Sequence, residues 1–160
     1  MGIVVGCNLG EFKRYYRKLA EDKEWQGTFG FTEELDTSWE IVLAQNPSQL
    51  IVIRENDEII GHLIWHVSNT EEHRKGDPRD EEDKQVLRKL LGEKKDFIEL
   101  HEIWLRQKHR GKGYGKNIFE FFEDFIRKKG YDSIVYYADH PAAIAICRKR
   151  GYEEAFLEKE

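Results

Sequence analysis

"DFIELHEIWLRQKHRGKGYGKNIFEFFEDFIRKKGYDSIVYYA", residues 96–138, alternates between apolar segments and a basic, glycine-rich loop. Residues 96–105 and 132–138 are rich in β-branched and aromatic residues, which predicts two strands. Residues 114–129 carry apolar residues at helical spacing and end in a basic turn before Gly130. A helix of this length makes the strands that it joins parallel neighbours with a right-handed crossover. The stretch therefore predicts a βαβ unit and an α/β fold, with a helical stripe of Ile118, Phe121, Phe122 and Phe125.

The first half of the chain predicts two helices followed by two strands. One apolar helical face predicts a helix over 11–25, and the same spacing after the capping residue Thr32 predicts a second helix. Two β-branched runs, 50–57 and 58–67, meet at Asn56-Asp57, which is a hairpin signature and predicts antiparallel strands. The helical faces consist of Phe12, Tyr15, Tyr16 and Leu19, and of Leu35, Trp39, Val42 and Leu43.

The remaining segments predict a charged insert and a last helix. Residues 69–92 begin with a highly charged stretch and continue as a short helix that stops at Gly92. A further helix is expected from Pro141, a favoured first helical position, to the basic residues before Gly151. The last eight residues have room for one short strand. Because neither an internal repeat nor a linker is evident, residues 1–160 are interpreted as a single domain.

The composition is that of a soluble globular protein. The 160 residues carry a net charge of -5, which argues against general nucleic-acid binding. No segment approaches membrane-spanning length, and the opening apolar run is too short for a signal peptide. Cys7 and Cys147 lack the spacing of a disulfide framework or a zinc site. We expect a cytoplasmic protein with no metal, no nucleic-acid partner and no membrane partner.

The loop over residues 106–116 has the features of a phosphate site. It precedes the first turn of a helix, where free N–H groups and the helix dipole attract anions, and glycines let backbone amides approach closely. Arg110 stands where the P-loop needs its first glycine, and Lys116 stands where the dinucleotide motif needs its third. A glycine-rich turn with solvated lysines is the alternative. The basic side chains of the loop are Arg106, Lys108, Arg110, Lys112 and Lys116.

Two motifs resemble the GNAT N-acetyltransferase superfamily. Arg110-Gly111-Lys112-Gly113-Tyr114-Gly115 matches the Arg/Gln-x-x-Gly-x-Gly/Ala signature, which follows the fourth strand and opens the third helix of that fold. "DHPAAIAICRKRGY", residues 139–152, is similar to the later Asn-x-x-Ala-Ile-x-x-Tyr-x-x-x-Gly-Phe motif. The resemblance covers residues 50–152 and, more loosely, the N-terminal third. It implies a mixed central sheet flanked by helices, in which the parallel strands 96–105 and 132–137 splay apart.

The resemblance also implies that acetyl-CoA binds between these strands. Loop amides would bind the pyrophosphate, the backbone around Leu105 would pair with the pantetheine arm, and an amide of the same strand would polarise the thioester carbonyl. His140 replaces the asparagine of the later motif, and it either donates to the pantetheine region or simply starts the helix. The residues implicated in cofactor binding are Ile103, Trp104, Leu105, Arg110, Gly111, Lys112, Gly113, Tyr114, Gly115, Lys116, His140, Ala143 and Cys147.

Acetyl transfer to an amine needs a base, because the nucleophile must be neutral. Glu99 is the first candidate, since it precedes Leu105 by six residues, the spacing of the catalytic glutamate in the histone-acetylating branch of the family. A solvated or ion-paired strand glutamate is the alternative. His101 and Glu102 are the other candidates: His101 shares a strand face with Glu99, while Glu102 points to the opposite face unless a bulge intervenes.

The general acid of the family is a tyrosine, and Cys147 occupies its position. A small apolar cysteine that packs on a helix is favoured over a proton donor. His62 and His66 are four residues apart, but their segment has the pattern of a strand, so we interpret them as core or edge histidines and not as a metal pair. The substitutes for the acid are Tyr136, Tyr137 and Tyr152, each also a plausible core aromatic.

The resemblance implies an acetyl-CoA-dependent N-acetyltransferase that moves the acetyl group directly to a primary amine of a small molecule, peptide or protein. A non-catalytic acyl-CoA-binding or regulatory module is the alternative, because Cys147 departs from the family pattern. Family members usually continue with two strands, whereas eight residues follow Tyr152. Either the acceptor side is open, or the chain is truncated, or a partner chain supplies a strand in a homodimer through the C-terminal sheet edge.

Overall fold

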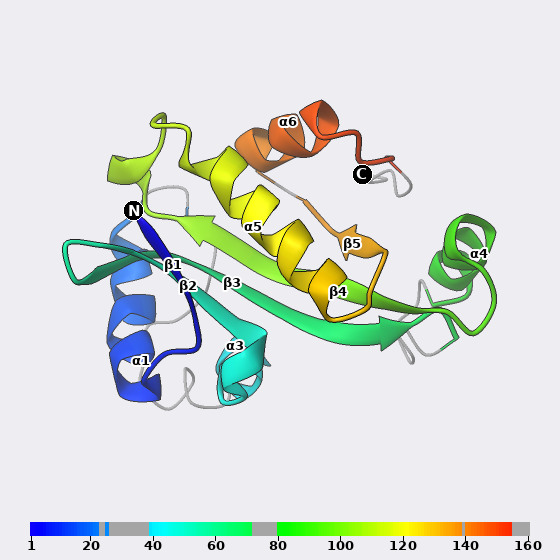
Figure 1. Ribbon diagram of the computed structural model, residues 1–160, viewed down its shortest axis with the longest axis horizontal. Helices are drawn as coiled ribbons and strands as arrows, with labels where there is room; N and C mark the ends of the chain where they lie inside the picture. The colour runs from blue at the N-terminus through cyan, green and yellow to red at the C-terminus, as the bar shows by residue number, and fades with distance from the viewer. Residues whose placement is uncertain (23–24, 26–38, 72–79, 139, 155–160) are drawn as a thin grey trace. The chain divides into compact units, whose positions relative to one another are not determined.

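The computed structural model describes residues 1–22, 25, 39–71, 80–138 and 140–154. The chain forms two compact units, Met1–His66 with Leu100–Phe121, and Val67–Glu99 with Phe122–Glu160. Five strands follow one another in the sheet in the order β1-β2-β3-β4-β5, and helices flank this mixed sheet (Figure 1). The α/β class expected from the sequence is therefore confirmed.

The first unit begins with a strand that the sequence analysis missed. β1 (Gly2–Val5) pairs antiparallel with β2 (Leu50–Glu55), with Val5 opposite Ile51. A four-residue strand between two glycines is too short to show an alternating pattern. β2 and β3 (Glu58–Asn69) form the expected hairpin, whose turn residues Asn56 and Asp57 both have positive φ, at 52° and 62°.

Two N-terminal helices cover one face of this hairpin. α1 (Leu9–Lys18) begins at the N-cap Asn8, whose side chain accepts the N–H of Glu11, and a 3-10 turn, Leu19–Glu21, extends it. The helical stretch is thus shorter than the expected 11–25. α3 (Trp39–Ala44) contains the end of the second expected helix, whose Thr32 and Leu35 lie outside the described residues. The buried core here comprises Phe12, Tyr15, Tyr16, Leu19, Ile41, Leu43, Ala44, Leu50, Val52, Ile59 and Ile64.

The crossover segment has the expected elements. β4 (Asp96–Leu105) leads through a 3-10 turn, Gln107–His109, and the glycine loop into α5 (Tyr114–Lys128). The buried stripe of α5 differs in part from the expected one, because Phe121 and Phe125 are half-buried while Phe119 and Ile126 are buried. Neighbouring aromatic residues leave the phase of the stripe ambiguous in the sequence.

The second unit contains β5 (Ile134–Tyr136) and two helices, α4 (Asp80–Leu91) and α6 (Pro141–Lys149). The N–H of Ile98, near the start of β4, donates to the carbonyl of Ser133 at 3.0 Å, just before β5. α4 ends before Gly92, whose φ of 108° suits a helix stop. Residues 72–79 of the charged insert and 155–160 of the expected last strand lie outside the described residues. A small core joins Leu87, Phe97 and Val135, with Leu91 and Tyr137 against it.

In the part of the chain that the structure describes, no helix has both the length and the apolar character needed to cross a membrane.

Candidate functional site

The glycine loop connects the end of β4 to the first turn of α5, as the sequence predicts. Gly111 and Gly113 both have φ of +79°, a region that L-residues with a Cβ rarely adopt, and both are exposed. The exposed backbone of this loop precedes the helix N-terminus, where unsatisfied N–H groups attract anions. The loop is therefore an exposed turn that depends on its glycines and lies directly before the first turn of α5.

Two of the basic side chains near the loop are engaged within the protein. Arg106 forms an ion pair with Asp22 at 3.1 Å and with Glu21 at 3.3 Å. Arg110 donates from Nε to the carbonyl of Leu105 at 2.8 Å, and its guanidinium lies 4.2 Å from the centre of the Trp104 ring. Of the five basic residues expected to serve an anion, Arg106 is thus already paired with carboxylates.

The loop is also anchored to the β2–β3 hairpin. Glu55 accepts the hydroxyl of Tyr114 at 3.0 Å, and its other oxygen lies 3.0 Å from Nδ1 of His109. The hydrogen bond from Tyr114 holds the pKa of Glu55 below its usual value, and the same bond raises the pKa of Tyr114. The Tyr114 side chain thus anchors the loop to the hairpin.

A hydrogen-bonded network around Glu102 lies in the same unit. Oε2 of Glu102 is 2.6 Å from Nε2 of His62, and the hydroxyl of Tyr16 donates to the same carboxylate at 2.9 Å. The other ring nitrogen of His62, Nδ1, is 2.6 Å from the Tyr15 hydroxyl. His62 is fully buried, whereas 20% of the Glu102 side chain is exposed. The network thus runs from the core to a carboxylate that solvent reaches.

Burial is the main cause of the high pKa of both tyrosines in this network. It raises the pKa of Tyr15 and of Tyr16 far above that of free tyrosine, and the charge of Glu102 raises both further. Both hydroxyls therefore keep their protons at any physiological pH. Tyr16 acts as a hydrogen-bond donor toward Glu102, and the Tyr15 hydroxyl is hydrogen-bonded to His62.

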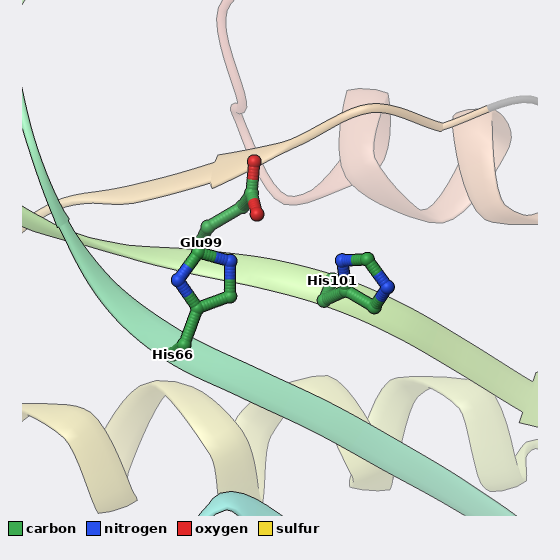
Figure 2. A group of neighbouring side chains, drawn as sticks. All are labelled: His66, Glu99 and His101. Atoms are coloured by element: carbon green, nitrogen blue, oxygen red, sulfur yellow. The ribbon is translucent and has the colours of Figure 1, made fainter. Parts of the chain in front are cut away.

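His101 and Glu102 both reach the N-terminal helices, although strict alternation would place neighbouring side chains on opposite faces. Glu40 of α3 pairs with Nε2 of His101 at 3.2 Å, and this hydrogen bond lowers the pKa of Glu40. Figure 2 shows the rings of His66 on β3 and of His101 on β4. Their centroids are 6.1 Å apart. Glu99 precedes His101 by two residues in β4 and is buried.

The end of β4 packs closely on β3. A Cβ on Gly61 would come within 2.6 Å of the carbonyl oxygen of Trp104, so glycine is needed there. The indole Nε1 of Trp104 donates to Asp22 at 3.2 Å, and the N–H of Arg106 donates to the carbonyl of Ile60 at 2.8 Å. These contacts hold β4 in position beside His62. Ile103, Trp104 and Leu105 are all half-buried.

The later motif lies in the second unit, on α6. His140 is the N-cap of this helix, and its Nδ1 accepts the N–H of Ala142 at 3.1 Å, which confirms that it starts the helix. Ala143 and Cys147 are half-buried. Burial, with a smaller effect of the Glu123 charge, raises the pKa of Cys147 to about 11, so the thiol is protonated at neutral pH.

Tyr152, one of the possible substitutes for the missing tyrosine, belongs to a second carboxylate network. Its hydroxyl donates to Glu123 at 2.9 Å, and Arg150 donates to the same carboxylate from Nε at 2.8 Å and from Nη2. Tyr136 and Tyr137 are half-buried near β5. Tyr152 is therefore hydrogen-bonded to a carboxylate that is already paired with arginine.

The Glu102 network is the functional feature that sequence reasoning missed. His62 was expected to be a core or edge histidine, and its burial confirms a core position. Its partners Tyr15 and Glu102 lie 47 and 40 residues away in the chain. The available signals were a histidine between apolar residues of one strand and two adjacent tyrosines on one helix, and neither signal identifies the other.

Comparison with known proteins identifies a family. The acetyltransferase (GNAT) family model matches residues 12–152 of this chain. No protein among the curated sequences matches it.

Solved structures share the fold at low sequence identity. An agmatine N-acetyltransferase in its apo form is 17% identical, with a TM-score of 0.68 over 94% of this chain and 82% of that one. A Drosophila melanogaster polyamine N-acetyltransferase is 13% identical, with a TM-score of 0.65 over the same shares, 94% and 82%. An acetyltransferase from Clostridium acetobutylicum, solved with acetyl-CoA, is 12% identical, with a TM-score of 0.62 over 99% and 95%.

Proposed function

The chain belongs to the acetyltransferase (GNAT) family, and from this premise we propose that it transfers an acetyl group from acetyl-CoA directly to a primary amine. The observation that carries the proposal is the glycine loop at the start of α5, in which Gly111 and Gly113, one residue apart, both have positive φ in an exposed backbone. Its sequence has the spacing of the family's pyrophosphate signature. This loop bears on acetyl-CoA, the acetyl donor, and does not identify the amine that accepts the acetyl group.

Residues of the first unit supply the groups that we assign to the binding of acetyl-CoA, the acetyl donor. Amides of residues 110–115 bind the pyrophosphate, with Lys108, Lys112 and Lys116 nearby as exposed cations. The carbonyl of Leu105 accepts from Arg110, and we assign the backbone around Leu105 to the pantetheine arm.

The reaction itself needs no covalent intermediate. An ammonium loses a proton to a base, and the nitrogen lone pair then forms a C–N bond with the thioester carbonyl carbon. The C–S bond breaks, its electron pair goes to the sulfur of CoA, and the second nitrogen proton leaves to sulfur or solvent. A thiolate is a good leaving group, so the protonated, half-buried Cys147 in the family's tyrosine position does not prevent the reaction.

The acceptor is proposed to be a cationic amine. Structural neighbours that act on polyamines and on agmatine make such amines the first to test. Glu102 of the first unit, whose side chain is 20% exposed, would attract a positively charged acceptor. The two free cysteines, Cys7 and Cys147, fit the reducing cytoplasm, where we place the reaction.

Release of CoA thiol tests the proposed function. Purified protein is mixed with acetyl-CoA and a panel of diamines, polyamines, arylalkylamines and lysine peptides, and free thiol is measured. We expect thiol release that depends on at least one amine. Tight CoA binding with no release over the whole panel would support a non-catalytic CoA-binding module instead.

A pair of loop variants tests the donor site. Gly113→Asp places a negative charge beside the pyrophosphate, while the isosteric Gly113→Asn adds the same bulk without charge. Aspartate and asparagine both tolerate the positive φ of this position better than other side chains do. Calorimetric titration with CoA should show affinity about 10-fold or more lower for Asp than for Asn, since each 1.4 kcal/mol is tenfold. Equal affinities of the two variants for CoA would mean that the loop does not bind the pyrophosphate.

A further inference from the structure

We propose that Glu102 is the catalytic carboxylate that removes the proton from the acceptor amine, and that His62, Tyr15 and Tyr16 are positioning residues that hold it. This inference rests on the proposed function and identifies the base of that reaction. Glu102 takes the role that sequence spacing had given first to Glu99.

The hydrogen bonds of the network have a defined direction. An ionised carboxylate only accepts, so Nε2 of His62 carries a proton and donates to Glu102 over 2.6 Å. The buried Tyr15 hydroxyl needs an acceptor for its own proton, and Nδ1 of His62, at 2.6 Å, is the acceptor that a neutral imidazole offers. His62 is therefore the neutral Nε2–H tautomer, assigned from its partners.

The hydrogen bonds of the network thus all lead, directly or through His62, to the carboxylate of Glu102. Tyr15 donates to His62, His62 donates to Glu102, and Tyr16 donates to the same oxygen of Glu102 at 2.9 Å. These bonds fix the rotamer of Glu102 while its side chain stays 20% exposed. In the part of the chain that the structure describes, no lysine or arginine forms an ion pair with Glu102. Its negative charge is held in place and left for an incoming cation.

The other two candidates on β4 are less suited to this role. Glu99 is buried, with 9% of the residue exposed, which limits the access of an acceptor to its carboxylate. His101 is paired through Nε2 with Glu40 at 3.2 Å. Glu102 combines access for the acceptor with a fixed position, which a general base requires.

The chemical step balances with groups already named. The ammonium of the acceptor gives one proton to a free lone pair of Glu102, which becomes a neutral carboxylic acid, and the amine becomes neutral. The amine then attacks the thioester carbonyl as described above, and Glu102 returns its proton to water. His62 and both tyrosines keep their protons throughout.

The test compares glutamine substitutions. Glu102→Gln should lower kcat by about 10²- to 10⁴-fold and leave the KM for acetyl-CoA nearly unchanged. Glu71→Gln is the matched control, since Glu71 is also a part-buried glutamate with a partner, Arg88, and lies outside the site. Glu99→Gln is measured in parallel. In Glu102→Ala, added formate should restore part of the turnover, because a small carboxylate can replace the missing base.

The positioning role is tested at His62. His62→Leu removes the donor and should lower kcat by about 10- to 100-fold, the scale of a misplaced catalytic group. His62→Gln keeps an N–H that can reach Glu102 and should recover part of this loss. Turnover is expressed per folded molecule, with the folded fraction taken from thermal unfolding, so that lost stability is not counted as lost catalysis.

The outcomes separate the two proposals. A wild-type protein that releases no thiol with any amine contradicts the proposed function and this inference together. An active wild type whose Glu102→Gln variant turns over normally, or whose Glu99→Gln variant loses more activity than Glu102→Gln, contradicts this inference alone. Equal kcat for His62→Leu and wild type would remove His62 from the positioning role.

Discussion

Glu102 in the first unit and Glu123 in the second are similar glutamates with different partners. Each accepts a tyrosine hydroxyl at 2.9 Å, from Tyr16 and Tyr152 respectively. Glu123 is also bound by the guanidinium of Arg150, which neutralises its charge. Glu102 instead has the imidazole of His62 as its second partner, at 2.6 Å.

This difference separates a structural carboxylate from one that is available for chemistry. Bonds from Arg150 and Tyr152 lower the pKa of Glu123, with Arg150 as the larger cause, and fix the residues after α6 to α5. Within the described residues, Tyr16 and His62 hold Glu102 without a lysine or arginine that would cancel its charge. We therefore expect a cationic acceptor to be attracted to Glu102 and not to Glu123.

Glu123→Gln should produce the largest effect on stability. It leaves Arg150 without its carboxylate and weakens a charged hydrogen bond, which costs about 1.5 to 3 kcal/mol in the free energy of unfolding. Urea unfolding monitored by circular dichroism measures this loss, and turnover per folded molecule should stay at the wild-type value. If turnover fell as far as in Glu102→Gln, the contrast between the two glutamates would be wrong.

The pH dependence of this stabilisation follows from the lowered pKa of Glu123. A carboxyl whose folded pKa is depressed contributes stability above its unfolded pKa, close to 4.5, and loses it as the pH falls through the folded value. The difference in unfolding free energy between wild type and Glu123→Gln should thus be complete near pH 7 and shrink steadily below pH 4.5. A difference that stayed constant down to pH 3 would mean that the charge of Glu123 is not its cause.

Removing the two tyrosine hydroxyls provides a closer comparison. Tyr16→Phe and Tyr152→Phe should each lower the free energy of unfolding by about 1 kcal/mol, the usual net value of a hydrogen bond. Only Tyr16→Phe should also lower kcat, by roughly 3- to 10-fold, since His62 still holds Glu102. Stopped assays at saturating acetyl-CoA measure both variants. An equal decrease in kcat for the two would assign Tyr16 a structural role alone.

Sequence reasoning found the glycine loop because its residues are consecutive. The strand 96–105, the loop and the helix that starts at residue 114 all lie in one stretch, so turn residues and periodicity locate them. The same holds for the hairpin at Asn56-Asp57 and for α6. Each of these elements depends on contacts within a few residues.

The Glu102 network could not be predicted in this way. Its tyrosines precede Glu102 by more than 80 residues, and only the packing of α1 and of β4 on β3 brings them together. The close approach depends on Gly61, a single glycine within an apolar strand, whose role is visible only in three dimensions. The alternation of side chains along a strand predicted that Glu102 and His101 lie on opposite faces of β4. In the structure both side chains reach the N-terminal helices.

The smallest expected effect concerns Cys147, whose thiol reports the charge of Glu123. Burial is the main reason that its pKa is raised to about 11, and the nearby carboxylate adds a smaller share. Glu123→Gln should therefore lower this pKa slightly and speed alkylation by iodoacetamide at pH 9 by about 2-fold, because the thiolate is the reactive form. Mass spectrometry of the Cys147 peptide measures the rate. Tyr152→Phe keeps the charge while weakening the same network, so a similar acceleration in that variant would attribute the change to local opening instead of electrostatics.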